Sequence, residues 1–294
     1  MTRGWSRLRR HHLARASLIF LIAIMVLSLA APLIAELRGV DPTQTDLFHR
    51  FEPPSAAYWL GTDDVGRDLF QRLLDGGRVS LLVGLAGALL SGLLGALIGV
   101  TAGYLGGRLD AVLMRFTDSV IALPLLPLLI VVAAVDPRKL GVPAELAQSE
   151  AFSLYRIVVI IALTGWTTVA RLVRAEALSL KARDFSRAAQ ALGARPIRIM
   201  LRHILPNTAG SLIVATTISM GTLILLESTL SFLGLGIQPP AASWGNMLTG
   251  AQELLQEAPL LALWPGLLIF LTVIAFNFLG DGLQDALDPR SERR

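Results

Sequence analysis

Long hydrophobic runs, separated by shorter stretches that hold most of the charged residues, dominate the pattern along the chain. A helix needs about 20 apolar residues to cross the roughly 30 Å hydrocarbon core of a bilayer. Six runs reach or approach that length, at residues 16–35, 79–102, 111–135, 156–173, 210–230 and 260–279. Because a helix satisfies its own backbone hydrogen bonds inside lipid, the pattern predicts an all-α integral membrane protein with six transmembrane helices, surrounded by membrane lipid.

The basic residues are distributed unevenly over the segments between these runs. Most of the 26 Lys and Arg residues lie in four places: residues 1–15, the segment around Arg108, residues 171–206, and the residues from Arg290 onward. Cytoplasmic segments of membrane proteins carry such an excess. The pattern therefore predicts that both termini are cytoplasmic. Residues 231–259 contain neither Lys nor Arg, which is typical of an outside loop.

The same pattern divides the chain into five parts. They are a cytoplasmic tail (1–15), a first transmembrane helix (16–35), an extracytoplasmic loop (36–78), a five-helix core (79–283) and a second cytoplasmic tail (284–294). Basic residues before the first run and Ser28-Leu29-Ala30 near its end are also found in cleaved signal peptides. The run is longer than a typical signal-peptide core and five more runs follow, so an uncleaved anchor is favoured.

Small residues recur at every fourth position of the second run. This small-residue ridge consists of Gly87, Ser91, Gly95, Gly99, Gly103 and Gly107. Small residues at this spacing let two helix backbones approach closely in a membrane. The ridge therefore predicts a helix-packing face, either within the bundle or toward a partner subunit. In the third run, Pro124 and Pro127 predict a bent helix, which either lines a pathway or is kinked packing.

Few polar side chains lie within the predicted spans, and each has a structural and a functional interpretation. Arg115 and Asp118 are three residues apart near one end of the third span, a spacing that favours an ion pair. Glu227 lies late in the fifth span, where an acid either contacts a cationic group in transit, lies in outside water or pairs with a partner. Asn277 in the sixth span either lines the pathway or forms a hydrogen bond between helices.

The segment 176–206, between the fourth and fifth spans, is basic, amphipathic and interrupted by Gly and Pro. Asp184 is expected to cap a short helix that ends at Gly193. The apolar face of this helix consists of Ala188, Ala189 and Leu192. Pro196 is expected to begin a second helix that ends at Pro206. Two short helices with a tight turn predict a rigid knob that enters a cleft on another protein, and an interfacial amphipathic hairpin is the alternative.

The extracytoplasmic segments offer two candidate surfaces for a partner. Tyr58 and Trp59 in the first of them are expected at the membrane interface. In residues 231–259, apolar side chains recur at helical spacing and predict an amphipathic segment on the outer surface or over a pore mouth. These side chains are Trp244, Met247, Leu248, Ala251, Leu254 and Leu255.

The composition excludes several kinds of chemistry. The chain has no cysteine, so it holds no disulfide, thiolate nucleophile or iron–sulfur cluster. Neither Lys139 nor Lys181 lies in a phosphate-binding Gly-rich loop, so any ATP hydrolysis takes place on another chain. The cluster of Asp63, Asp64 and Asp68 lacks the spacing of a calcium loop and predicts a turn with helix-capping carboxylates. We expect no catalytic residue, metal site or cofactor, and no nucleic-acid partner.

The basic loop resembles a known motif. Phe185-Ser-Arg-Ala-Ala-Gln-Ala-Leu-Gly193 and His203-Ile-Leu-Pro-Asn207 are similar to the EAA…G…LP loop of ABC importer permeases. In that family this loop is the coupling helix, which docks on the ATP-binding subunit. The resemblance carries this role onto Ala188, Ala189, Gly193, Leu205 and Pro206, with Leu192 on the same helix. Arg187 stands where the family usually has Glu.

Further segments resemble the second permease of dipeptide, oligopeptide and nickel importers. These are residues 60–68, 102–107, 230–246 and 275–290. The resemblance implies a type I-like permease bundle in the bacterial cytoplasmic (inner) membrane that forms a heterodimer with a homologous permease. It also implies one or two ATP-binding subunits and an extracytoplasmic solute-binding protein as partners. Peptides, a nickel complex, an opine or an oligosaccharide remain open as the transported solute.

Two other functions are compatible with the residues. An ion-coupled secondary transporter would use Glu227 and Asp118 as proton sites, although the chain shows no internal repeat of the kind such carriers often have. A non-transporting membrane scaffold would use its loops as docking sites. Co-purification with an ATPase is expected of the importer, and uptake by this chain alone is expected of the carrier.

Overall fold

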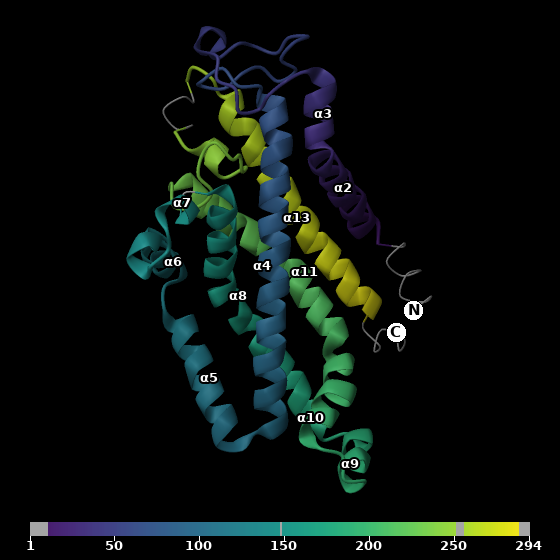
Figure 1. Ribbon diagram of the computed structural model, residues 1–294. Coiled ribbons are helices and arrows are strands. Elements are labelled where there is room, and N and C mark those ends of the chain that lie inside the picture. Colours follow the sequence, from purple (N-terminus) through teal and green to yellow (C-terminus); the bar gives the residue numbers. More distant parts are fainter. Residues whose placement is uncertain (1–10, 148, 251–255, 288–294) are drawn as a thin grey trace.

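The computed structural model describes residues 11–147, 149–250 and 256–287, which form a helical bundle with loops at one end (Figure 1). The helices are α2 (His12–Leu29), α3 (Ala31–Arg38), α4 (Leu69–Leu105), α5 (Gly107–Ala122), α6 (Leu125–Ala134), α7 (Ala144–Ala147), α8 (Glu150–Lys181), α9 (Asp184–Ala191), α10 (Pro196–Ile199), α11 (Leu205–Phe232) and α13 (Leu260–Leu287). Short 3-10 helices are η1 (Leu47–His49), η2 (Pro137–Leu140) and η4 (Asn246–Leu248), and a π-helix, η3 (Met200–Ile204), joins α10 to α11. We name the end with α9 and α10 the knob end, and the opposite end, with α3, the loop end.

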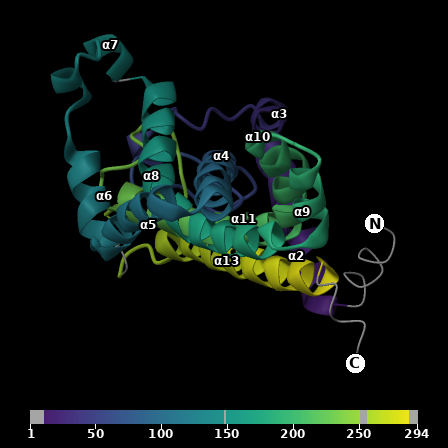
Figure 2. The ribbon, with the colours of Figure 1, turned by 90° about the horizontal axis from the view of Figure 1, so that it is seen from below.

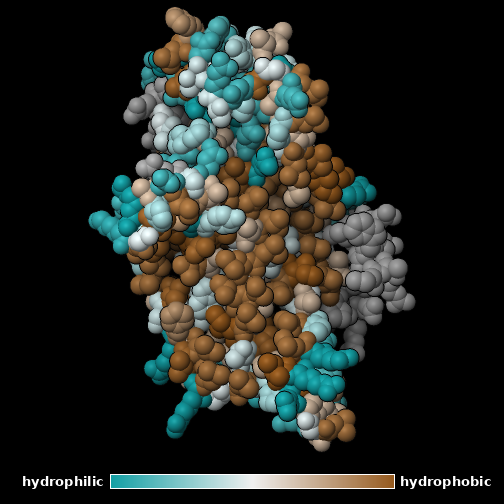
Figure 3. Space-filling model, viewed as in Figure 1, coloured by the Kyte–Doolittle hydropathy of each residue, from teal (hydrophilic) through white to brown (hydrophobic). Residues whose placement is uncertain are grey.

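The bundle has the dimensions and surface of a membrane protein. Among the described residues, 5 helices are long and apolar enough to cross a bilayer, and α5 with α6 forms one further, sharply bent pair. Figure 3 shows apolar side chains over the middle of the molecule and hydrophilic ones gathered toward both ends. The predicted all-α architecture with up to 6 spans is therefore confirmed.

The third span is broken rather than gently kinked. Its two halves, α5 and α6, meet at an angle of 87°. Leu123 and Pro124 between them both have extended backbone conformations. A residue before proline avoids the helical region, because the proline ring would clash with it. Pro127 lies in the first turn of α6, where a missing backbone N–H costs little.

The longest helix, α4, begins at Leu69 instead of the predicted Val79. The side chain of Asp68 accepts a 2.7 Å hydrogen bond from the backbone N–H of Gln71 and so caps the helix. At 37 residues, α4 is roughly 55 Å long and extends beyond a bilayer core of about 30 Å. It runs from the loop end to the knob end of the molecule (Figure 1).

From Ser91 to Gly103 the small-residue ridge lies on α4 and faces α8 of the same chain. Gly107, its last predicted member, instead begins α5 and has no neighbour within 4 Å of an added Cβ. A Cβ atom added to its glycines would lie 2.6 Å from Val169 Cβ at Gly95, 2.6 Å from the Ala170 carbonyl oxygen at Gly99 and 2.7 Å from the Arg174 carbonyl oxygen at Gly103. Nearer the loop end, a Cβ on Gly165 of α8 would lie 2.6 Å from Ser91 Oγ. Gly87 has more room, 3.3 Å from a methyl group of Leu223 on α11. The backbones of α4 and α8 therefore touch along most of the ridge, which we name the α4–α8 seam.

The remaining spans surround this pair. Seen from below, α11 and α13 lie side by side, with α2 next to α13 (Figure 2). Buried apolar side chains form one cluster at the loop end, one in the middle and one at the knob end. Examples are Leu69 and Trp244 for the first, Val83 and Ile161 for the second, and Val100 and Val173 for the third.

Two ion pairs connect α5 to α8. Asp110 binds Arg174 through two hydrogen bonds, one of them 2.6 Å long, and Asp118 binds Arg171. The predicted pair between Asp118 and Arg115 on the same helix is therefore wrong. A neighbouring helix supplies the cation, because the α8 arginine reaches the carboxylate directly.

Substitution of Gly99 by alanine tests the α4–α8 seam. The new methyl group would meet the backbone of α8, which cannot move away as a side chain can. We expect the free energy of unfolding to fall by about 1–3 kcal/mol, as for other overpacked sites, measured by thermal unfolding in detergent. Gly266→Ala is the control, since a Cβ there has no neighbour within 4 Å. Equal unfolding midpoints for both variants would contradict a tight seam.

Candidate functional site

The predicted knob consists of α9 and α10, joined by a turn at Gly193. This glycine has φ +79°, a conformation that residues with a Cβ rarely adopt. The backbone N–H groups of Gly193 and Ala194 donate to the carbonyl groups of Gln190 and Ala189 and close the end of α9. Pro196 occupies the first turn of α10. Figure 1 shows α9 projecting beyond the rest of the bundle.

Apolar packing fixes the knob to the bundle. Ile199 and Ile204, both 0% exposed, belong to the same cluster as Val173 of α8 and Val100 of α4. Ala189 packs against this cluster from α9. Because close-packed interiors transmit displacement, a force on α9 acts on the ends of α4 and α8 together.

The structure separates the predicted coupling residues into two groups. Arg187, Ala188 and Leu192 are exposed, and 88% of the surface of Leu192 is open to solvent. Ala189 and Leu205 instead pack against the knob-end cluster. The exposed group forms the surface that another protein can contact, and the packed group holds that surface in place.

Two local expectations for this loop were wrong. Arg183, rather than Asp184, is the N-cap of α9. Asp184 lies in the first helical turn, where the positive end of the helix dipole still stabilises its carboxylate. Pro206 does not end the second helix. It lies in the first turn of α11, and η3 continues the helical path from α10 into this span. Because proline has no backbone N–H to donate to the preceding turn, the regular α-helical hydrogen bonding is interrupted there, and the π-helix η3 lies directly before it.

Glu227, the acid predicted late in the fifth span, is enclosed by the chain. It is 0% exposed. Ser231 Oγ donates to one carboxylate oxygen over 2.7 Å, and Ser80 Oγ of α4 donates to the other over 3.0 Å. Buried polar groups stabilise a fold when they are hydrogen-bonded. This carboxyl group therefore links α11 to α4 through serine hydroxyls.

The loop after α11 is attached to the same group of residues. Ser80 Oγ accepts a hydrogen bond from the backbone N–H of Trp244, and the indole N–H of Trp244 donates to the Leu73 carbonyl over 2.9 Å. Ser231 Oγ accepts from the backbone N–H of Ile237. We name Glu227, Ser80, Ser231 and Trp244 the loop-end hub. Its members come from α4, α11 and the following loop.

The prediction for residues 231–259 is wrong for Trp244 on an outer surface, while Met247 and Leu248 pack, partly buried, against the loop-end cluster. Trp244 is 0% exposed rather than at an outer surface, and η4 is the helical turn that follows it. Ala251, Leu254 and Leu255 of that prediction lie outside the described residues. No local signal indicated the hub, because Ser80 and Glu227 are 147 positions apart.

Asn277, the second predicted pathway residue, lies on an exposed part of α13. Its side-chain amide donates to the Val273 carbonyl of the same helix over 3.0 Å. Asn277 and Glu227 are therefore in different surroundings, one on the surface of the bundle and one in its interior. The structure does not bring them together in one site.

The acidic residues before α4 form the capping turn that the sequence predicted. Asp63 accepts hydrogen bonds from the backbone N–H groups of Val65 and Arg67. No group of three or more potential metal-ligating side chains occurs in the described ranges. In the same loop, the hydrogen bond between His49 and Asp46 raises the pKa of His49 and lowers the pKa of Asp46.

Replacement of Glu227 distinguishes a structural hub from a transport contact. Glu227→Ala leaves the Ser80 and Ser231 hydroxyl groups without their acceptor, so we expect the free energy of unfolding to fall by about 1–3 kcal/mol. Glu227→Gln retains an acceptor oxygen and is expected to lose less. Thermal unfolding, followed by tryptophan fluorescence, measures both. Normal stability of Glu227→Ala, with transport lost, would contradict the structural role.

Comparison with known proteins identifies the family. Residues 95–293 match the family described as binding-protein-dependent transport system inner membrane component. Residues 1–54 match the N-terminal TM domain of oligopeptide transport permease C. The first match alone covers well over half of the chain.

Individual relatives extend over nearly the whole sequence. The oligopeptide transport system permease protein OppC of Bacillus subtilis is 37% identical over 97% of this chain and 88% of its own. The dipeptide transport system permease protein DppC of the same organism is 39% identical over 99% and 86%. The glutathione transport system permease protein GsiD of Escherichia coli is 40% identical over 97% and 89%.

The fold itself also has a solved counterpart. The crystal structure of an amino acid ABC transporter with histidines matches with a TM-score of 0.50 at 16% identity, over 74% of this chain and 94% of that chain. The relatives are transport permeases rather than enzymes. The chain belongs to the binding-protein-dependent transport system inner membrane component family, and it is a multi-pass inner-membrane permease of the ABC importer type.

Proposed function

We propose that this chain and a homologous permease form the path by which an ATP-driven importer carries peptides or a related small solute. ATP hydrolysis takes place on separate subunits that dock on the knob. The observation that carries this proposal is the knob itself, an exposed helix fixed to the ends of α4 and α8 by buried apolar packing. Relatives named for oligopeptides, dipeptides and glutathione support the solute class.

The distribution of charge supports an orientation with the knob in the cytoplasm. Of the 26 Lys and Arg residues, 18 lie in the segments assigned to the knob side, namely residues 1–15, Arg108, Arg115, residues 171–206 and Arg290 onward. The segments on the other side carry the remaining 8, and residues 231–259 carry none of them. The positive-inside rule then places the knob end and both termini in the cytoplasm. The loop end faces outward, where a solute-binding protein delivers its load.

The mechanism is alternating access. ATP binding brings the two ATPase subunits together and displaces the knobs, and the bundle opens outward to receive the solute. Hydrolysis returns the bundle to the inward state. Each ligand drives its step only by binding one state better than the other. The knob-end cluster supplies the rigid connection, since Ile199, Val173 and Val100 join the knob to two spans.

The alternative of an ion-coupled carrier has less support from the same geometry. Its proposed proton sites, Glu227 and Asp118, are both engaged. Glu227 is enclosed among serine hydroxyls, and Asp118 pairs with Arg171. The scaffold alternative offers no use for a knob that is packed onto the ends of two membrane spans.

Two substitutions in the knob test coupling. Gly193→Pro is incompatible with φ +79°, because proline holds φ near −65°. Ala188→Trp places a bulky ring on the exposed docking face. We expect both variants to remain in the membrane while ATP-driven uptake by the reconstituted importer falls at least tenfold, with ATP hydrolysis no longer linked to uptake.

Matched variants keep this test specific. Ala111→Trp alters an exposed alanine on α5 at the same end of the molecule and is expected to leave uptake unchanged. A large residue at Ala189 is expected to uncouple for a different reason, because Ala189 packs against the knob-end cluster. Normal uptake by Gly193→Pro and Ala188→Trp would contradict docking at the knob.

A further inference from the structure

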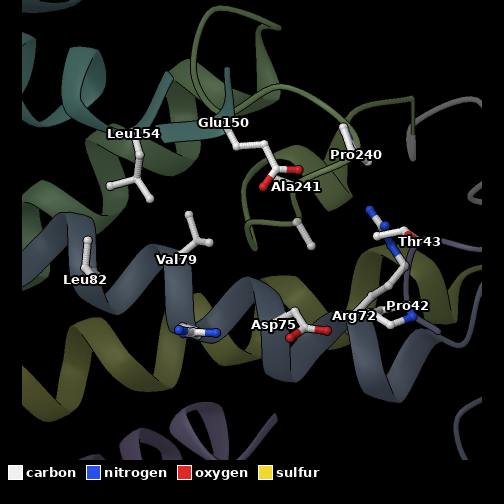
Figure 4. A pocket seen from close by; sticks show the side chains of 12 residues that line it. Pro42, Thr43, Arg72, Asp75, Val79, Leu82, Glu150, Leu154, Pro240 and Ala241 are labelled. Carbon is white, nitrogen blue, oxygen red and sulfur yellow. The ribbon is translucent and has the colours of Figure 1, made fainter. Parts of the chain in front are cut away.

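A cleft of about 340 Å³ opens at the loop end of the molecule, between α4, the start of α8 and the loop that precedes η4. Figure 4 shows Asp75 and Arg72 on α4 below the cleft and Glu150 across from them. Val79, Leu82 and Leu154 line its apolar part. A concave site with apolar walls and a few charged groups is typical of small-molecule binding, and its volume lies in the usual range of about 300–1,000 Å³.

Arg72 is the unusual member of this lining. Its side chain is only 6% exposed. Its one ionic contact runs from Nε to Asp63 over 3.3 Å, and the same Asp63 oxygen already accepts a 2.7 Å hydrogen bond from Arg67. Across the described residues, the Arg72 guanidinium donates no hydrogen bond. A guanidinium group has five N–H donors. The nitrogens of Arg72 are not among the fully enclosed side-chain atoms of the described residues that lack a partner, so they remain open toward the cleft.

The carboxylates share the cleft with a second cation, Arg78, and the charges of Arg72 and Arg78 both act on Asp75. Asp75 is partly buried, and its one side-chain contact is a 3.3 Å hydrogen bond from the amide of Gln71. In the part of the chain that the structure describes, neither Asp75 nor Glu150 forms an ion pair. Figure 4 shows the Glu150 carboxylate directed into the space near Ala241, and the Asp75 carboxylate on α4 below that space.

We propose that this cleft binds a zwitterionic solute, with the carboxylate of the solute on Arg72 and its ammonium group between Asp75 and Glu150. This inference rests on the proposed function and adds the solute chemistry that the permease itself recognises. The planar guanidinium of Arg72 can hold a carboxylate by two parallel hydrogen bonds. An ammonium group supplies the direct ion pair that neither carboxylate forms with Arg72 or Arg78. A short peptide with free ends carries both groups.

Equilibrium binding of radiolabelled dialanine to the purified importer complex, without its solute-binding protein, tests the proposal. We expect saturable binding that weakens at least tenfold in Arg72→Gln and in Asp75→Asn. Arg67→Gln is the matched control. Arg67 contacts the same Asp63 more closely than Arg72 does but does not line this cleft, so this variant is expected to bind dialanine as the wild type does.

Modified dipeptides identify which end each residue holds. Dialanine amide lacks the carboxylate. On the wild type, it is expected to bind at least tenfold more weakly than dialanine. On Arg72→Gln, the amide and dialanine are expected to bind with equal affinity. N-acetyl-dialanine lacks the ammonium group. It is expected to bind the wild type at least tenfold more weakly than dialanine, and to bind Asp75→Asn as well as dialanine does. Arg72→Lys keeps the positive charge but not the planar guanidinium group. Its affinity for dialanine is expected to lie between those of the wild type and Arg72→Gln, and it replaces Arg72→Gln in the test if that variant does not fold.

Three results would overturn the proposal. They are an absence of saturable dialanine binding to the wild type, wild-type affinity in Arg72→Gln, and unchanged discrimination against the amide in that variant. ATP-driven uptake by the same complex, reconstituted in liposomes together with its solute-binding protein, tests the proposed function separately. Dialanine binding without uptake would contradict the proposed function, whereas uptake that is insensitive to Arg72→Gln and Asp75→Asn would contradict the cleft alone.

Discussion

The close approach of α4 and α8 is the constraint on which the rest of the structure depends. In lipid, the hydrophobic effect does not drive helices together, so close backbone contact and van der Waals packing supply the attraction between them. At Gly99 and Gly103 the two backbones touch, and no residue with a side chain fits there. Both helices are therefore fixed in register along this seam. Anything attached to the end of one is attached to the other.

The two ends of the α4–α8 seam are finished by different chemistry. At the knob end the contacts are apolar, and they join Ile199 and Ile204 to Val173. At the loop end they are polar and directional, because Glu227 and Trp244 each hold α4 by hydrogen bonds. Apolar contacts transmit force but are not directional, whereas hydrogen bonds are directional and hold a loop in one position. A knob that transmits force at one end and a loop-end hub held in place at the other both require a rigid connection between them, and the α4–α8 seam supplies it.

Features that depend on local sequence were predictable, and those that depend on distant residues were not. The fourfold spacing of small residues from Gly87 to Gly103 and the turn at Gly193 are local, and the structure places both on packing or turn positions. Asp118 has a local candidate partner in Arg115, yet it binds Arg171, 53 positions away. The loop-end hub spans a still longer separation. Hydropathy likewise located the third span but not its break, which follows from the backbone restriction that Pro124 imposes on Leu123.

The broken span is held differently from the others, and this difference bears on where the bundle can move. α5 buries only Thr117 among its side chains. Its connections to α8 include the ion pairs Asp110–Arg174 and Asp118–Arg171 and the stacked rings of Phe116 and Trp166. The second pair is about half exposed on both sides, and exposed ion pairs contribute little, typically 0–1 kcal/mol. α8 is locked to α4 by backbone contact, so α8 is held less tightly to α5 than to α4. If the knob is displaced, as the proposed function requires, this weaker contact is where α5 can part from the α4–α8 pair.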